Sequence, residues 1–279
     1  MYCFRNGEIV PCEDAVVHAS DLGLLRSYAA FDYLRTYNGR PFRLADHLAR
    51  FRNSADGLKL PLEYSNDEIK EIIGELLARC GLTEACVRLV ITGGNSPDSM
   101  TIVKPNFFIL IEKVPRYAPE CWTDGVRLIT NEYLRDVPEL KSTGYLNAIM
   151  LMPLVKKHGA HDLLYCHGGR VLELARNNIF LFMDDTLVTP KDDILPGITR
   201  KVLLELCDGV FPIEERDVPT SDLGRATEAF LCGTTKGVMP VVQVDDTTIG
   251  DGTVGPNTRK AMELFREYAG KNQGINSPE

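Results

Sequence analysis

The sequence lacks any long apolar run. A membrane-crossing helix needs about 18 to 20 apolar residues in a row, and the longest candidate, Ala148 to Val155, is shorter and is interrupted by Pro153. The first ten residues, MYCFRNGEIV, do not place a basic region before an apolar one, so they predict no signal peptide. We therefore expect no membrane partner.

Cysteine pairs in a C-x-x-C spacing are also absent. The chain has eight cysteines, and at this length, without a signal peptide, they are typical of free, mostly buried thiols in a reducing compartment. This predicts a cytoplasmic protein. His158, His161, Cys166 and His167 lie close together in the sequence, but they follow a predicted helix end and turn rather than a zinc-ligand spacing, so we predict no metal site.

An excess of positive charge is missing as well. The 31 lysines and arginines are outnumbered by 39 aspartates and glutamates, which gives a net charge of −8. Proteins that bind a nucleic-acid backbone normally carry a basic face, so we expect no nucleic-acid partner. A local basic pocket for a small anion is compatible with this composition. The P-loop, the G-x-S-x-G elbow and the H-E-x-x-H motif are absent too.

The composition that remains is ordinary for a globular protein. Hydrophobic residues make up 44% and charged residues 25%, and the length of 279 residues predicts one large or two modest domains. Two prolines and a glycine within residues 115–125 (PRYAPECWTDG) indicate a connection. We therefore predict a small N-terminal domain over residues 1–114 and a larger C-terminal domain over residues 126–279.

Turn and cap signals indicate the elements on either side of this connection. Asn6-Gly7 and Asn38-Gly39 predict tight hairpin turns. Ser65 and Glu68 predict a capping box for a helix that Gly81 ends. The helices expected in the second half span residues 144–158, 198–207 and 257–269. Strands and helices mixed without regular alternation predict an α+β fold.

Four stretches of the second half carry residues that suit chemistry. They are Glu139–Tyr145 (ELKSTGY), Glu173–Phe180 (ELARNNIF), Leu195–Arg200 (LPGITR) and Gly233–Gly237 (GTTKG). In this order, and together with Phe31-Asp32 and an H-x-x-R-x-x-x-S-A segment over residues 47–55, they resemble the class IV (fold-type IV) aminotransferases, which use pyridoxal 5'-phosphate. That family includes branched-chain aminotransferases, D-amino-acid aminotransferases and aminodeoxychorismate lyase.

The resemblance covers residues 2–268 and implies an overall architecture. The expected fold has two domains of α+β type, with a small N-terminal α/β lobe and a larger cofactor-binding lobe. The resemblance also implies a homodimer with the active site at the subunit interface.

The resemblance assigns three residues to the reactive part of the cofactor. Lys141 forms the Schiff base, and burial near cationic groups lowers the pKa of such an amine so that it can act as nucleophile and proton carrier. Glu173 faces the pyridine nitrogen and keeps it protonated, which makes the ring an electron sink. Tyr145 contacts the ring hydroxyl, although branched-chain members usually place this tyrosine one residue later.

The cofactor phosphate is assigned to a helix start and two side chains. Gly197, Ile198 and Thr199 open a helix whose first amides suit an anion. Arg50 adds a guanidinium, and Thr234 adds a hydroxyl. The alternatives are an ordinary first turn of a helix and a surface ion pair of Arg50.

The substrate pocket departs from the known patterns. The stretch from Thr92 to Met100 lacks the Arg-x-His pair of well-known D-amino-acid aminotransferases, and Cys86-Val87-Arg88 lacks the tyrosine of the branched-chain motif. The resemblance places five substrate-binding candidates in this pocket. They are Arg26, Phe31, Arg88, Arg176 and Thr235.

The three arginines suggest a replacement for the missing carboxylate trap. A planar guanidinium suits a carboxylate, and several of them suit a dicarboxylate such as 2-oxoglutarate. The alternative is that they pair with carboxylates such as Asp32 or Glu173 as structural bridges. We expect a ping-pong transaminase acting on a D-amino acid, such as D-alanine or D-glutamate, and a 2-oxo acid. The alternatives are an L-branched-chain aminotransferase, an aminodeoxychorismate lyase and a non-catalytic small-molecule binder.

Overall fold

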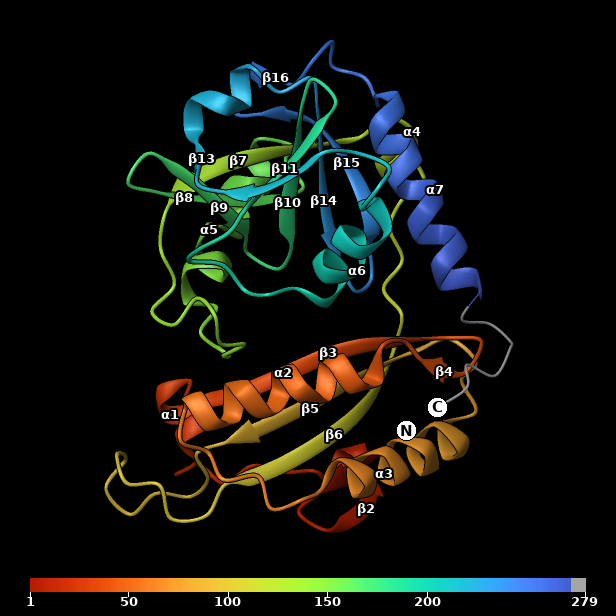
Figure 1. The fold of residues 1–279 in the computed structure, drawn as a ribbon. Helices are drawn as coiled ribbons and strands as arrows, with labels where there is room; N and C mark the ends of the chain where they lie inside the picture. The colour runs from red at the N-terminus through yellow and green to blue at the C-terminus, as the bar shows by residue number, and fades with distance from the viewer. Residues whose placement is uncertain (272–279) are drawn as a thin grey trace. The chain divides into compact units, whose positions relative to one another are not determined.

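Two β-sheets, each with its own hydrophobic core, divide the chain into two structural units (Figure 1). The computed structural model describes residues 1–271. Unit 1 comprises Met1–Pro115, Leu140–Gly144 and, among the described residues, Gly270 and Lys271. Unit 2 comprises Arg116–Glu139 and Tyr145–Ala269. No helix in the described part is long and apolar enough to span a bilayer.

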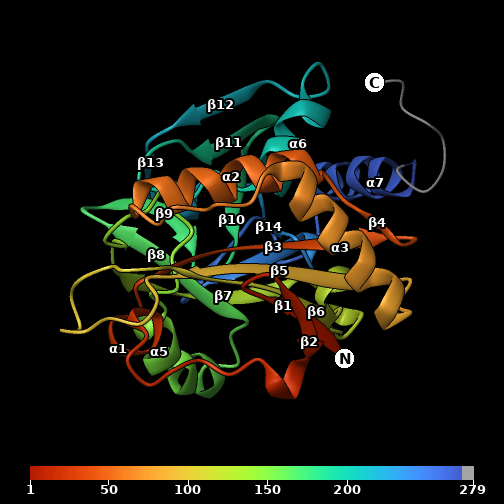
Figure 2. The same ribbon diagram turned by 90° about the horizontal axis from the view of Figure 1, so that it is seen from below.

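Unit 1 is built on a six-stranded antiparallel sheet in the order β2-β1-β6-β5-β3-β4. Its strands are β1 (Tyr2–Arg5), β2 (Glu8–Pro11), β3 (Ala29–Tyr37), β4 (Arg40–Pro41), β5 (Ala85–Thr92) and β6 (Asn106–Lys113). Its helices are η1 (Cys12–Asp14), α1 (Leu22–Arg26), α2 (Leu44–Gly57) and α3 (Asn66–Cys80). Both α2 and α3 cover the same face of the sheet (Figures 1 and 2), where Phe51 and Ile73 are fully buried against it.

The local signals of unit 1 are confirmed. Asn6-Gly7 joins β1 to β2 with Arg5 opposite Glu8, and both turn residues have positive φ, 49° and 105°, as the two-residue turn requires. Before α3, the Ser65 hydroxyl accepts from the Glu68 amide at 3.2 Å, and the Glu68 carboxylate accepts from the Ser65 amide at 2.7 Å. This capping box satisfies two amides at the helix start.

Unit 2 contains a ten-stranded mixed sheet in the order β12-β11-β10-β14-β15-β7-β8-β9-β13, with β16 paired to β15. Its strands are β7 (Val126–Glu132), β8 (Asp162–His167), β9 (Arg170–Leu174), β10 (Asn178–Met183), β11 (Thr186–Pro190), β12 (Ile213–Arg216), β13 (Val218–Pro219), β14 (Glu228–Gly233), β15 (Gly237–Val244) and β16 (Thr247–Thr248). Its helices are α4 (Glu120–Thr123), α5 (Leu146–Lys157), α6 (Ile198–Cys207), η2 (Thr220–Gly224) and α7 (Pro256–Lys271), of which the last two residues fall in unit 1. Two parallel pairings join β7 to β8 and to β15.

One short segment departs from the predicted division and from the predicted helix. Residues 140–144 belong to unit 1, although the sequence predicts them in the larger domain, and α5 begins at Leu146 rather than at residue 144. The reason is a backbone pairing with β3. The Phe31 amide donates to the Lys141 carbonyl at 2.9 Å, and the Thr143 amide donates to the Ala29 carbonyl at 3.1 Å. The chain therefore stays extended across Lys141 before the helix starts.

Candidate active site

The predicted site residues fall into two groups, one in each unit, and each group is described by itself. Unit 1 holds Arg26, Phe31, Arg50, Arg88 and Lys141, and unit 2 holds Tyr145, Glu173, Arg176, Gly197, Ile198, Thr199, Thr234 and Thr235.

In unit 1, two elements fix the backbone of Lys141. Its carbonyl accepts from Phe31 on β3, and its amide donates to the Ser54 hydroxyl of α2 at 3.0 Å. The preceding Leu140 packs against Gly57, where an added Cβ would lie 2.6 Å from a Leu140 methyl carbon. Glycine at this position therefore lets the lysine segment approach α2 closely.

The Phe31 ring lies beside two cationic side chains. Lys141 Nζ is 4.6 Å and Arg88 Cζ is 5.8 Å from the ring centroid. Both distances are within the range of cation–π attraction. Arg88 also forms an ion pair with Glu112, with its Nε 2.5 Å from Oε1. Arg88 therefore forms a structural ion pair, as the alternative predicted. It also shares the Phe31 ring with Lys141.

Behind this ring, Asp32 anchors a buried network of charged groups. Arg50 donates to both carboxylate oxygens, from Nε at 2.8 Å and from Nη2 at 2.9 Å, and His47 Nδ1 lies 2.6 Å from Oδ1. Burial alone would raise the pKa of Asp32, but Arg50 and His47 lower it well below its usual range. The pKa of His47 is lowered, mainly by burial, and the charges of Arg50 and Lys141 act in the same direction.

This network buries Arg50 against Asp32 and His47 rather than in a surface ion pair. Arg50 is 8% exposed, and its partner Asp32 is fully buried, so the alternative of a solvent-exposed pair is wrong. Because the pairing is bidentate, it fixes the plane of the guanidinium. Arg26, in contrast, lies at the exposed end of α1, where its Nη1 donates to the Leu25 carbonyl at 2.9 Å.

In unit 2, Glu173 is 5% exposed and is held from both sides of its carboxylate. Arg135 pairs with Oε1 at 2.7 Å, and the Leu195 amide donates to Oε2 at 3.1 Å. A carboxylate held in this way can accept a further hydrogen bond, such as one from the nitrogen of a protonated pyridine ring. Arg135 was not among the predicted residues.

Two neighbouring asparagines join the remaining groups of unit 2. Asn178 donates to the Leu195 carbonyl at 2.9 Å, and an added Cβ on Gly197 would lie 2.0 Å from its Oδ1. Asn177 also lies close to Gly233, where an added Cβ would be 2.5 Å from its Oδ1. The two glycines therefore bring the start of α6 and the turn after β14 against one Asn-Asn pair.

The start of α6 and the turn after β14 offer donors for an anion. Gly197 is the N-cap of α6 and has no side-chain cap, and the first amides of a helix have no partner within the helix. Thr199 is buried at this end, and Thr234 and Thr235 occupy the turn between β14 and β15. A buried carboxylate, a helix start and two hydroxyls within one unit fit the pyridine nitrogen and the phosphate of pyridoxal phosphate.

Tyr145 and Arg176 complete the predicted set in unit 2. Tyr145 packs in a cluster that also contains Tyr133 and Tyr165. The Arg176 side chain is 57% exposed, and its Nε lies 4.0 Å from Asp162. Asp162 was not named as a pairing partner from the sequence.

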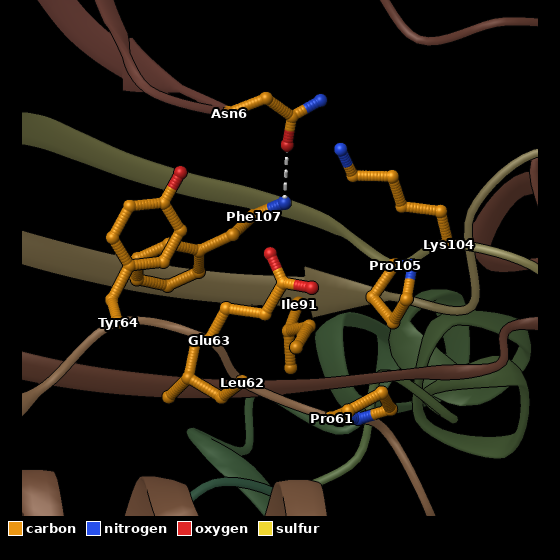
Figure 3. Close-up of a pocket in the computed structure, with 9 residues that line it drawn as sticks. All are labelled: Asn6, Pro61, Leu62, Glu63, Tyr64, Ile91, Lys104, Pro105 and Phe107. Carbon is orange, nitrogen blue, oxygen red and sulfur yellow. Dashed lines mark hydrogen bonds between the residues drawn. The ribbon is translucent and has the colours of Figure 1, made fainter.

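Unit 1 also has a small pocket that none of the predicted residues lines (Figure 3). The Tyr64 and Phe107 rings lie together on one side of it, with centroids 5.2 Å apart, and the Phe107 amide donates to Asn6 at 2.8 Å. These contacts connect the first hairpin to β6. We assign no ligand to this pocket.

Comparison with known proteins identifies the class of this fold. The amino-transferase class IV family model matches residues 29–244. The chain therefore belongs to the class IV aminotransferase family and is an enzyme of that class. Members of this family use pyridoxal phosphate.

Curated relatives with two different names are similar to this chain. A putative branched-chain-amino-acid aminotransferase of Methanocaldococcus jannaschii is 32% identical, with 97% of each chain covered. A D-alanine aminotransferase of Staphylococcus epidermidis is 30% identical, with 95% of this chain and 96% of the relative covered.

Solved structures agree on the fold. The branched-chain aminotransferase of Escherichia coli matches with a TM-score of 0.91 at 26% identity, covering 99% of this chain and 96% of the other. The enzyme of Thermoproteus uzoniensis, solved with norvaline, matches with a TM-score of 0.86 at 27% identity, covering 96% and 94%. The predicted two-lobe fold of α+β type is thereby confirmed.

Proposed function

We propose that this aminotransferase moves the amino group of a D-amino acid, such as D-alanine or D-glutamate, to a 2-oxo acid such as 2-oxoglutarate. The observation that carries the proposal is the placement of Arg88 and Lys141 around the Phe31 ring. A substrate whose Cα lies at the lysine meets this guanidinium, and its carboxylate would share Arg88 with Glu112. The more exposed Arg176 adds a cation that shares Asp162 with Lys236, a residue of the turn that carries Thr235. An L-branched-chain side chain would need apolar walls instead.

We assign a cofactor role to each of the predicted residues in its own unit. Glu173 would hold the proton at the pyridine nitrogen, and Tyr145 would contact the ring hydroxyl. The start of α6, Thr234 and Arg50 bind the phosphate. When bound, the cofactor supplies the electron sink that weakens the Cα–H bond of the substrate. Lys141 binds the cofactor and then, as a free amine, takes and returns the proton at the substrate Cα.

A second copy of this chain is the proposed partner. Leu146, Ile149 and Met150 of α5 are 73%, 68% and 69% exposed, and the exposed Leu154 continues the same helix face. Apolar residues at such spacing on one helix face indicate a surface that another protein covers. A homodimer would bury this face and would allow Arg26 to act on the partner's site. The eight free cysteines, five of them buried, support a reducing compartment such as the cytoplasm.

The test is a comparison of two amino donors with 2-oxoglutarate as acceptor. We expect purified enzyme to use D-alanine and to leave L-leucine almost unused. Turnover of L-leucine alone would overturn the D-amino-acid proposal. The matched control is Lys141→Ala, which should abolish turnover of either donor.

The second candidate is an L-branched-chain aminotransferase. It is favoured by the relative from Methanocaldococcus jannaschii and by the structural match to the Escherichia coli enzyme. An aminodeoxychorismate lyase would instead release pyruvate without an amino acceptor, and a non-catalytic binder would show neither reaction. The same assay, run with and without 2-oxoglutarate, separates these outcomes.

A further inference from the structure

Asp162, at the start of β8, is a buried carboxylate that the proposed mechanism does not use. It is 1% exposed. The Leu163 amide donates to its Oδ1 at 2.9 Å, and Asn177 Nδ2 donates to its Oδ2 at 3.2 Å. Two cations approach the same Oδ2, with Lys236 Nζ at 3.8 Å and Arg176 Nε at 4.0 Å.

The two cations differ in their access to solvent. The Lys236 side chain is 3% exposed, whereas that of Arg176 is 57% exposed. Lys236 lies in the turn between β14 and β15, where its amide donates to the Gly233 carbonyl at 3.2 Å and its carbonyl accepts from Trp122 Nε1 at 3.2 Å. Only the arginine is therefore open to a ligand.

Charge balance gives the buried lysine a role. One carboxylate between two cations leaves one positive charge in excess among the three groups. A buried carboxylate without a counter-ion is costly, so Asp162 must pair with at least one of the cations. If Lys236 provides that pairing, the charge of Arg176 is available for an anion. If Lys236 does not, Asp162 competes with the anion for Arg176.

We propose that Lys236 is a positioning residue that acts as the buried counter-ion of Asp162 and so keeps Arg176 available to bind a substrate carboxylate. This rests on the proposed function, because it takes Arg176 as a substrate-binding residue. The expected ligand is the carboxylate of an amino acid or 2-oxo acid, with the second carboxylate of 2-oxoglutarate favoured over the methyl group of pyruvate.

Protonation of Lys236 makes this arrangement pH-dependent. Burial lowers the pKa of Lys236 to about 8; Asp162 and Cys121 of α4 oppose the shift, and Arg176 adds to it. His161 faces the same lysine, and burial lowers its pKa to about 4, so it is neutral when Lys236 titrates. The Tyr117 ring, 5.6 Å from Nζ, completes the surroundings. Above pH 8 the lysine loses its charge, and Asp162 then competes for Arg176.

The test is a double-mutant cycle read as the KM for 2-oxoglutarate at pH 7. We expect Lys236→Met to raise this KM about tenfold with a smaller change in kcat. Asp162→Asn alone should leave a KM no higher than that of the wild type. The double variant Lys236→Met/Asp162→Asn should return the KM to within about threefold of the wild type, because nothing then competes for Arg176. Lys191→Met, which removes an exposed lysine of the same unit, is the matched control and should leave the KM unchanged.

Two results would overturn the proposal. The first is a KM for 2-oxoglutarate that is unchanged in Lys236→Met. The second is a KM of the double variant that is at least as high as that of Lys236→Met, which is the result that a purely structural role of Lys236 predicts. Lys236→Arg keeps the positive charge, so its KM for 2-oxoglutarate should be close to that of the wild type. The thermal unfolding midpoint of each variant shows whether it is folded. In the wild type, kcat/KM should fall above about pH 8, and this fall should be absent from the double variant.

The cycle remains informative if the proposed substrate is wrong. It can be run with whichever amino donor the wild type uses, because the KM is measured for the acceptor. Failure of the D-alanine assay with a restored KM in the double variant would reject the D-amino-acid proposal alone. Turnover of D-alanine with no restoration would reject the role of Lys236 alone.

Discussion

Asp32 in unit 1 and Asp162 in unit 2 are each buried against two basic side chains, and these two clusters differ in how tightly they are bonded. In unit 1, Asp32 lies 2.6 to 2.9 Å from His47 and Arg50, and the arginine contact is bidentate. In unit 2, Asp162 lies 3.8 and 4.0 Å from Lys236 and Arg176. Short, bidentate bonds fix one geometry, whereas the longer contacts leave the exposed arginine able to exchange one anion for another.

This difference matches the ligands that we assign to the clusters. A cofactor phosphate stays in place through every turnover, so a rigid guanidinium at Arg50 suits it. Substrate carboxylates enter and leave in each half of a ping-pong reaction, so a cation held loosely suits them. Each substitution below changes one structural unit and leaves the other intact.

The largest expected effect is on the unit 1 cluster. Asp32→Asn leaves Arg50 buried without its charged partner, and breaking a buried pair in this way costs about 3–5 kcal/mol of the free energy of unfolding. Urea unfolding at pH 7 measures this. A loss below about 1 kcal/mol would show that the network is not as tightly coupled as its geometry indicates.

The acid dependence of the same variant follows from the pKa of Asp32. Because the folded-state pKa is lowered, the stabilisation is present above the unfolded pKa of about 3.9 and is lost as the pH falls below it. The stability difference between wild type and Asp32→Asn should therefore narrow below about pH 4. A constant difference down to pH 2 would contradict this.

The next effect concerns the charge of Lys236 in unit 2. Its folded-state pKa of about 8 lies below the unfolded value of about 10.4, so the unfolded state binds more protons between these two pH values. Relative to Lys236→Met, the wild type should gain up to about 3 kcal/mol of stability as the pH rises from 8 to 10.4. Urea unfolding of both proteins across this range measures the gain. If the free energies of unfolding of the two proteins change in parallel with pH, the pKa of Lys236 is not lowered in the folded state.

A moderate effect is expected where unit 1 holds the lysine segment. Gly57→Ala places a Cβ 2.6 Å from Leu140, and we expect about 1–3 kcal/mol of destabilisation by overpacking. The shift of Leu140 should also lower kcat more than it raises KM, because Lys141 follows it directly. Gly74→Ala on α3, where an added Cβ meets no atom within 4 Å, is the matched control and should leave kcat unchanged.

The smallest effect is expected for Asp162→Asn. Asparagine keeps the shape of the side chain, and Lys236 can lose its proton, so the variant should lose only about 1 kcal/mol. A smaller loss of stability than in Asp32→Asn would support the difference between a tightly bonded and a loosely bonded cluster. Equal losses of stability in the two variants would contradict that difference.

Local signals were sufficient to predict much of the fold. Asn6-Gly7 and the Ser65–Glu68 capping box determine their structures through neighbouring residues, and α6 begins and ends where the sequence predicted. The strands β11 and β12 were missed. Thr186–Pro190 (TLVTP) ends in proline, and three of the four residues of Ile213–Arg216 (IEER) are charged, so neither has the apolar alternation that is typical of a strand.

The candidate site was predicted only where its residues lie in recognisable motifs. Arg135 reaches Glu173 across 38 positions, and Lys236 reaches Asp162 from the turn between β14 and β15. No sequence spacing indicates such pairs, because the sheet pairings bring them together. The extended course of Lys141 was missed for the same reason, since its pairing partner β3 lies more than 100 residues earlier.

The most direct test of the account is the first half-reaction with the two enantiomers of one amino acid. Purified holoenzyme is mixed with D-glutamate or L-glutamate in the absence of a 2-oxo acid, and the absorbance of the bound cofactor is followed in a stopped-flow instrument. We predict that D-glutamate changes the absorbance at least about 100-fold faster than L-glutamate does. Faster reaction of L-glutamate would contradict the account.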